Sequence, residues 1–190
     1  MTDEHAPPGW DRNPSAKSAR HPQFVLGIAG FLVASYLPLF QLGVVDTVWD
    51  PFFRDGTRIV LTSKLAQTFP VPDASLGAAA YLFEAVTDEI GGEKRWHRRP
   101  WVVLAFGAAV YGLGATSVVL AIVQPVVLDT WCTLCLASAA ISISLVGPAT
   151  DEVLASLQYL RRAHDEGESL RDAVRKGTHA TASMPTGEGS

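Results

Sequence analysis

The chain has 190 residues, a formal net charge of −4 and 48% apolar residues. Its length suits a single domain, and the acidic balance, with no basic stripe that carries interleaved aromatic residues, argues against nucleic-acid binding. The apolar residues are gathered in long runs rather than dispersed, which argues against a soluble protein.

Four apolar runs predict four membrane helices, at about 23–45, 75–90, 101–123 and 127–149. A membrane helix needs about 20 mostly apolar residues. The second run is the shortest and carries acidic residues. We therefore predict an all-α membrane protein: a four-helix transmembrane bundle with short outer-loop helices and a C-terminal amphipathic helix.

Residues 1–22 precede the first run and are rich in proline, serine and charge, so they predict a disordered cytoplasmic N-terminal arm. The first run is longer than the apolar core of a signal peptide, which has about 7–15 residues, and no small-residue cleavage site clearly follows it. We therefore expect a retained helix.

Residues 46–74 form the predicted outer loop. Asp50 followed by Pro51 has the form of an N-cap before the first helical position, and Thr57 predicts the start of a second short helix. The loop also has an aromatic face, made of Trp49, Phe52 and Phe53. Two interpretations of this face remain open: an anchor in the membrane interface, or a lid over a pocket that faces the membrane.

Residues 150–176 predict an amphipathic cytoplasmic helix that lies on the inner membrane surface. Its apolar stripe consists of Val153, Leu154, Leu157 and Leu160. Residues 177–190 are small and polar, and they predict a disordered tail.

The lysine and arginine residues predict the orientation. With four spans, most of them fall on one side: Arg12, Lys17, Arg20, Lys94, Arg95, Arg98, Arg99, Arg161, Arg162, Arg171, Arg175 and Lys176. Only Arg54, Arg58 and Lys64 fall on the other. The positive-inside rule therefore predicts a multi-pass protein of the plasma membrane with both termini in the cytoplasm and the 46–74 loop outside.

The two cysteines of the chain, Cys132 and Cys135, lie at the outer end of the fourth run. On a helix their Cα atoms would lie roughly 5–5.5 Å apart, within the range that a disulfide accepts. Asp129 or Thr130 is the expected N-cap, which would place Cys132 in the first turn, where the helix dipole favours a thiolate. Disulfides persist outside the cytosol, so the pair predicts a redox-active dithiol.

Three other interpretations of the pair remain. The thiols can be inert, because free cysteine is often simply a small buried residue. A static disulfide would stabilise little, because it closes a very short loop. A structural zinc site needs about four ligands, and all five histidines fall on the predicted cytoplasmic side, so we expect no metal.

Three segments carry a resemblance to the vitamin K epoxide reductase family: 50–57 (DPFFRDGT), 72–81 (PDASLGAAAY) and 131–135 (WCTLC). The resemblance covers about residues 23–149. It implies a four-helix membrane bundle with the Cys-x-x-Cys at the outer end of the fourth helix, and it implies quinone chemistry, with menaquinone, ubiquinone or a similar quinone.

The resemblance also implies roles for particular residues. Cys135 would meet the quinone, and Cys132 would exchange with a second thiol pair. Asp73 matches the polar residue that hydrogen-bonds the quinone carbonyl, which an aspartate can do only when protonated; otherwise it is simply a helix cap. With Asp73, Phe52 and Phe53 complete the predicted quinone-binding set.

One feature departs from the family pattern, because the 46–74 loop has no cysteine and cannot relay thiols to Cys132. We therefore predict a membrane thiol–quinone oxidoreductase that exchanges electrons with an exported thioredoxin-like or other dithiol protein. The alternative is a non-catalytic membrane protein that binds a quinone or lipid and has lost the relay.

Overall fold

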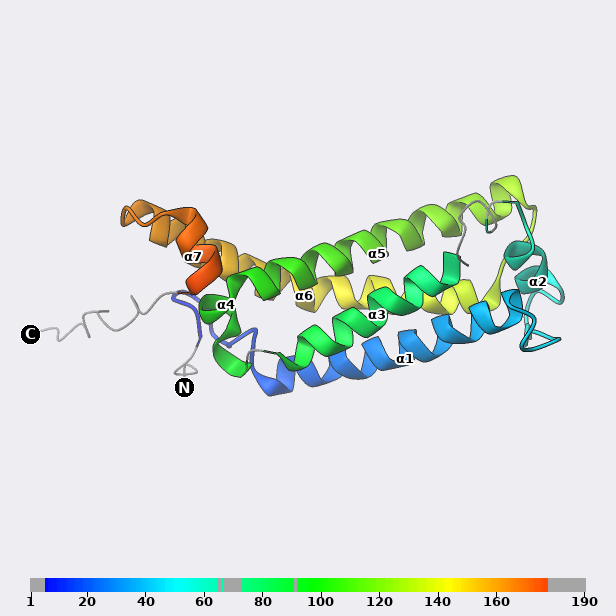
Figure 1. The fold of residues 1–190 in the computed structure, drawn as a ribbon, viewed down its shortest axis with the longest axis horizontal. Helices are drawn as coiled ribbons and strands as arrows, with labels where there is room; N and C mark the ends of the chain where they lie inside the picture. The colour runs from blue at the N-terminus through cyan, green and yellow to red at the C-terminus, as the bar shows by residue number, and fades with distance from the viewer. Residues whose placement is uncertain (1–5, 65, 67–72, 91, 178–190) are drawn as a thin grey trace, which may run out of the picture.

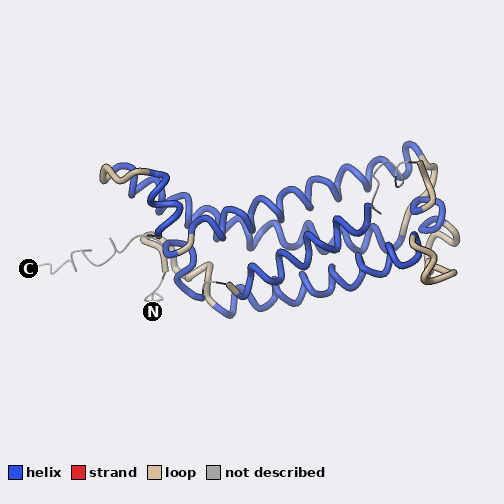
Figure 2. The backbone as a smooth tube through the Cα atoms, in the orientation of Figure 1, coloured by secondary structure: helices blue, strands red, loops and turns tan. Residues whose placement is uncertain are grey.

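The computed structural model describes residues 6–64, 66, 73–90 and 92–177. Four long helices run alongside one another (Figure 1): α1 (Lys17–Gln41), α3 (Asp73–Glu89), α5 (Pro100–Val127) and α6 (Thr133–Asp165). The shorter elements are α2 (Gly56–Leu61), η1 (Gly92–Lys94), α4 (Arg95–Arg98) and α7 (Leu170–Lys176). Figure 2 shows helices joined by loops, and the described residues include no strand.

The bundle has two different ends (Figure 1). One end, called the α2 end below, holds α2 and the connection between α5 and α6. The other, the α7 end, holds α4, α7 and residues 6–16. α1 packs against α3 and α6, and α5 packs against the same two helices, which closes the four-helix arrangement.

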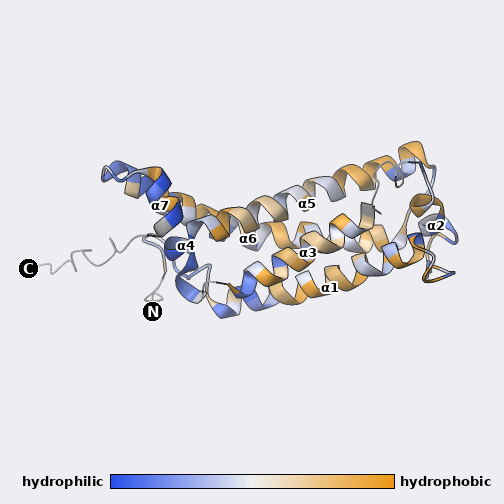
Figure 3. Cartoon of the chain, in the orientation of Figure 1, coloured by the Kyte–Doolittle hydropathy of each residue, from blue (hydrophilic) through white to orange (hydrophobic). Residues whose placement is uncertain are grey.

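Three of the long helices, α1, α5 and α6, are long and apolar enough to cross a membrane. The chain is therefore an all-α membrane protein, as the sequence predicts. Figure 3 shows hydrophobic residues along the bundle and hydrophilic ones gathered at the α7 end. α3 has 17 residues, which corresponds to a length of roughly 25 Å. The prediction that it crosses the membrane fully stays a prediction.

Small residues bring α1 and α3 close together. A Cβ added at Gly30 would lie 2.6 Å from Cδ1 of Tyr81, and one added at Gly27 would lie 3.5 Å from Cβ of Ala85. Close approach through small residues is a common way to pack helices in membranes, where the lipid leaves little hydrophobic drive between them. It places the Tyr81 ring in the bundle interior, where its hydroxyl donates to the carbonyl oxygen of Ser138 at 2.6 Å.

A buried ionic network joins three segments at the α7 end. Arg95 donates to both carboxylate oxygens of Glu152, each at 2.5 Å, and to Asp88 at 3.1 Å. All three side chains are buried. Burial alone would lower the pKa of Arg95, but the hydrogen bonds and charges of Glu152 and Asp88 outweigh this effect and raise it. Arg95 is therefore a fixed internal cation that joins α3, α4 and α6.

Residues 6–16 pack onto this network, which differs from the disordered arm predicted for 1–22. Ser15 is fully buried and donates to the Glu152 carboxylate, and the Asn13 amide donates to the carbonyl of Glu93 at 2.8 Å. The Trp10 indole N–H donates to Gln158 at 3.0 Å. The segment thus adds a donor to the buried Glu152 carboxylate, and α1 begins at Lys17 rather than at residue 23.

The C-terminal part consists of two helices rather than the single one predicted over 150–176. α6 continues to Asp165 and ends in a Schellman motif: Gly167 has φ +85°, its N–H donates to His164, and the Glu168 N–H donates to Ala163. The predicted stripe also divides, since Val153 and Leu160 are buried whereas Leu154 and Leu157 are exposed. Of the predicted tail, residues 178–190 lie outside the described part.

Candidate redox site at the α2 end

The cysteine pair forms a disulfide at the start of α6. The Cα atoms of Cys132 and Cys135 lie 5.2 Å apart. Cys132 is itself the N-cap, with an extended backbone, and its sulfur accepts a hydrogen bond from the N–H of Cys135 at 3.1 Å. The expected caps, Asp129 and Thr130, are wrong: Asp129 has φ +52° and belongs to the turn before the helix. The sulfur of Cys132 thus accepts a hydrogen bond from a backbone N–H in the first turn of α6.

A glutamine of α5 fixes the backbone of Cys132. Gln124 is 4% exposed, and its side-chain oxygen accepts the Cys132 N–H at 2.8 Å. This hydrogen bond joins the end of α5 to the beginning of α6 across the connecting turn. Sequence reasoning missed Gln124, and the available signal was a lone amide inside a helix that is otherwise apolar.

The two sulfurs have different surroundings. Cys132 is fully buried in an apolar cluster with Leu37, Leu61 and Leu134, whereas Cys135 is half-buried and packs against the edge of that cluster. The cluster includes residues of α1 and α2 and Ala74 at the start of α3. Cys135 is therefore the more accessible sulfur, and the loop that carries α2 covers Cys132.

One carboxylate ties this covering loop to α6. Asp50 accepts hydrogen bonds from the Thr133 hydroxyl, from the N–H of Thr57 at 2.6 Å and from the N–H of Phe53 at 3.1 Å. Partial burial alone would raise the pKa of Asp50, but these hydrogen bonds outweigh it and lower the pKa below its ordinary value. Asp50 is thus an ionised clamp between the loop and the first residue of α6.

The described residues of the loop, 46–64 and 66, hold one short helix instead of two. α2 begins at Gly56, and Thr57 lies inside it, so the expected helix starts at Asp50 and Thr57 are wrong. Asp50 does accept the N–H of Phe53, three residues on, as an N-cap does, but residues 51–55 form turns rather than a helix, and Asp50 also bonds to Thr57 and to α6.

Gly56 allows the loop to lie directly on the cysteine turn. A Cβ at this position would overlap the carbonyl oxygen of Trp131 and lie 2.9 Å from the Thr130 hydroxyl. Only glycine leaves room for this backbone approach. The neighbouring Phe53 ring lies 6.5 Å from the ring of Trp131, centroid to centroid. The cover is therefore fitted to the 130–131 segment that leads into the disulfide.

The predicted quinone-binding residues are only partly brought together. Phe53 lies beside Trp131, next to the cysteines, whereas Phe52 is 76% exposed. α3 begins at Asp73, but the side chain of Asp73 and residues 67–72 lie outside the described part. Among the described residues, no group of three or more His, Cys, Asp or Glu side chains could hold a metal ion.

Comparison with known proteins places these features in a family. A model of the vitamin K epoxide reductase family matches residues 22–150, which include α3, α5, most of α1, the first half of α6, the covering loop and both cysteines. The chain belongs to the vitamin K epoxide reductase family. The resemblance that the sequence motifs carry is therefore confirmed. No curated protein and no solved structure matches the chain.

Membership of the vitamin K epoxide reductase family supports, in general terms, a membrane oxidoreductase that transfers electrons between thiols and quinones. It also supports a membrane location, in agreement with the three helices long enough to cross a bilayer. The cysteine pair at disulfide distance fits this chemistry.

Proposed function

We propose that this member of the family is a thiol–quinone oxidoreductase whose redox centre is Cys132–Cys135. The observation that carries the proposal is the unequal environment of the two sulfurs. The sulfur of Cys132 accepts an N–H and is covered by a loop, while Cys135 is half-buried and packs against the apolar cluster around Cys132. The half-buried Cys135 thus suits contact with an apolar electron acceptor, and Cys132 can exchange with a protein thiol once the loop that covers it is displaced.

The thiol half of the reaction uses the disulfide as oxidant. A thiolate of the partner attacks Cys132 Sγ, a partner–Cys132 bond forms, the Cys132–Cys135 bond breaks, and Cys135 leaves as thiolate. The partner's second thiolate then attacks the partner sulfur of this mixed disulfide and releases Cys132. The partner leaves as a disulfide, and the two electrons and two protons of its thiols remain to be passed on.

One group of the chain favours the second exchange. The Cys135 N–H, which lies 3.1 Å from Cys132 Sγ, stabilises the Cys132 thiolate that this exchange releases. Because Cys132 is covered by the loop around α2, we propose that the Asp50 clamp releases this loop before a protein partner reaches the sulfur.

The quinone half restores the disulfide. Cys135 gives up the electron pair, the Cys132–Cys135 bond re-forms, and a quinone that takes two electrons and two protons leaves as quinol. Val33 and Tyr36 of α1 pack, like Cys135, at the edge of the apolar cluster, and such apolar side chains fit a flat apolar ring. Asp73, Phe52 and Phe53 are the further proposed contacts; Phe53 lies beside Trp131.

The partner and the orientation are also part of the proposal. The covering loop has no cysteine, so the dithiol belongs to a separate exported thioredoxin-like or similar protein. The α2 end faces the outside of the plasma membrane and the α7 end faces the cytoplasm, because the excess of lysine and arginine lies at the α7 end.

The test follows quinone absorbance after the purified protein is mixed with a reduced dithiol partner and a soluble menaquinone or ubiquinone analogue. Quinone reduction is expected with the wild-type chain and with Ser144→Ala, which changes an exposed hydroxyl on the same helix. It should be lost in Cys132→Ser and Cys135→Ser. Full activity in Cys135→Ser would overturn the mechanism.

The absence of cysteines from the 46–74 loop favours one alternative, a non-catalytic protein that binds a quinone or lipid. Trapping of thiols in cells with an alkylating reagent distinguishes this alternative from the oxidoreductase. A pair that stays oxidised under every reductant and oxidant supports the alternative, whereas a pair that cycles supports the oxidoreductase.

A further inference from the structure

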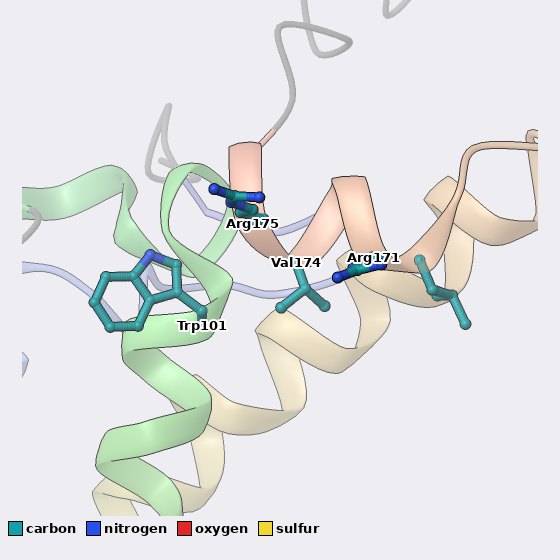
Figure 4. Close-up of a pocket in the computed structure, with 5 residues that line it drawn as sticks. Trp101, Arg171, Val174 and Arg175 are labelled. Carbon is teal, nitrogen blue, oxygen red and sulfur yellow. The ribbon is translucent and has the colours of Figure 1, made fainter.

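An open hollow of about 780 Å³ lies at the α7 end, between the first turn of α5 and the short helix α7 (Figure 4). It is lined by Trp101, Leu170, Arg171, Val174 and Arg175. We propose that this hollow binds the headgroup of an anionic phospholipid. The proposal concerns the opposite end of the bundle from the cysteines and does not depend on the redox function.

Two arginines give the hollow its charge. Arg171 and Arg175 are four residues apart on α7, so they lie on the same helix face. Both are exposed, and neither forms an ion pair within the described residues. Guanidinium groups bind phosphate oxygens through paired N–H donors. Two of them one helical turn apart therefore suit a single phosphodiester.

Two more arginines precede Trp101, a residue that lines the hollow, by two and three positions in the sequence. Arg98 and Arg99 immediately precede α5, and both are exposed. The backbone of Gly177, at the end of α7, packs directly against the carbonyl group of Arg98. This contact keeps α7 beside the start of α5. Asp172 is the acidic residue within α7, and it is not among the residues that line the hollow.

The apolar lining identifies the ligand as a lipid rather than a free anion. Trp101 is 53% exposed on the first turn of α5, which is one of the helices able to cross a membrane. Tryptophan at such a position marks the membrane interface. Leu170 is also exposed and Val174 partly so. A phosphate ion would use the arginines alone, whereas a phospholipid also places its glycerol and first acyl carbons against the apolar residues.

The arrangement distinguishes a site from general attraction to the membrane. A basic residue near an anionic membrane surface contributes a similar attraction wherever it lies. A site requires these particular arginines, so a double substitution here must do more than an equal loss of charge elsewhere at the same end. Arg161 and Arg162 provide that comparison, because both are exposed on the last turns of α6.

The experiment measures lipid bound to the full chain by native mass spectrometry in mild detergent, after addition of phosphatidylglycerol or phosphatidylcholine. We expect wild type and R161Q/R162Q to retain one phosphatidylglycerol in preference to phosphatidylcholine. R171Q/R175Q should lower its retention at least tenfold, and R171K/R175K should lower it less. Equal losses in R171Q/R175Q and R161Q/R162Q would overturn the site, as would equal retention of both lipids by wild type.

Further measurements distinguish lipid binding from phosphate binding, and a loss of lipid binding from misfolding. Trp101→Ala should weaken phosphatidylglycerol binding, and inorganic phosphate at equal concentration should not displace the lipid. Displacement by phosphate, or no effect of Trp101→Ala, would overturn the lipid assignment. Quinone reduction and the melting temperature without added lipid should match wild type in R171Q/R175Q, so a loss of lipid binding is distinguishable from a failure of the redox mechanism.

Discussion

The two ends of the bundle are held together by different kinds of interaction. At the α7 end, Arg95, Glu152 and Asp88 form a fully buried ionic network. At the α2 end, the cysteines are held by apolar packing, one amide and one partly exposed carboxylate. A buried charge network is costly to open, because each charge would lose its partner. The contrast suggests that the α7 end is the fixed base and the α2 end is the part that opens for exchange.

The largest loss of stability is expected from Glu152→Ala, which leaves Arg95 buried without its main partner. Removal of one member of a buried ion pair costs about 3–5 kcal/mol. Thermal unfolding in detergent should show a marked drop in the melting temperature, while disulfide reduction at low temperature stays close to wild type. A melting temperature like that of wild type would contradict the view of this end as the fixed base.

Gly56→Ala tests the fit of the cover at the opposite end. The added Cβ overlaps the carbonyl of Trp131, and steric crowding of this kind costs about 1–3 kcal/mol. We expect a lower melting temperature and faster reduction of the disulfide by a small thiol. Gly112→Ala is the matched control, since nothing lies within 4 Å of its new Cβ; an equal effect in both variants would rule out the fitted cover.

Asp50→Asn tests the charge of the clamp. The pKa of Asp50 is lowered in the fold from 3.8, so its stabilisation is complete above pH 3.8 and is lost as pH falls through the lower folded value. At neutral pH the variant should lose about 1–2 kcal/mol, because hydrogen bonds to a charged acceptor weaken. Its melting temperature should also fall less than that of wild type on acidification below pH 4.

Asp46→Asn serves as the control for this pH series, because Asp46 is exposed. The melting temperature of this variant should change with pH as that of wild type does. If Asp50→Asn and wild type lose stability in parallel below pH 4, Asp50 does not carry the clamp.

The smallest change in melting temperature is expected at Glu84, and it should have the opposite sign to that of Glu152→Ala. Glu84 is as buried as Asp88, yet neither of its carboxylate oxygens has a hydrogen-bond partner among the residues that the structure describes. Replacement of an unpartnered buried polar group by an apolar one removes a desolvation cost. We expect Glu84→Leu to leave the melting temperature unchanged or raised slightly. A drop as large as that of Glu152→Ala would show that burial alone, rather than pairing, decides the effect.

The sequence predicts those parts of the fold that depend on local patterns. The apolar runs near 23–45, 75–90, 101–123 and 127–149 predict the four long helices, and the spacing of Cys132 and Cys135 predicts a pair at disulfide distance. Periodicity and spacing are local properties of the chain, so a single sequence contains them.

Contacts between distant segments were not predictable in the same way. Arg95 and Glu152 are far apart in the sequence, and the topology rule treats Arg95 simply as a loop charge, although it is buried in an ion pair. The same holds for Gln124 bonded to Cys132 and for Asp50 bonded to Thr133. Each of these contacts depends on how the helices pack. The contacts that residues 6–16 make are also long-range, so composition alone predicts disorder there.

The central claim is that electrons pass from the Cys132–Cys135 dithiol to a quinone. A single-turnover experiment tests it most directly: the protein is reduced, freed of reductant and mixed with a quinone analogue, and quinol and free thiols are both counted. We predict one quinol formed per chain with the loss of both thiols, and none in Cys135→Ser. Quinol formed while both thiols remain, or formed equally by Cys135→Ser, would contradict the account.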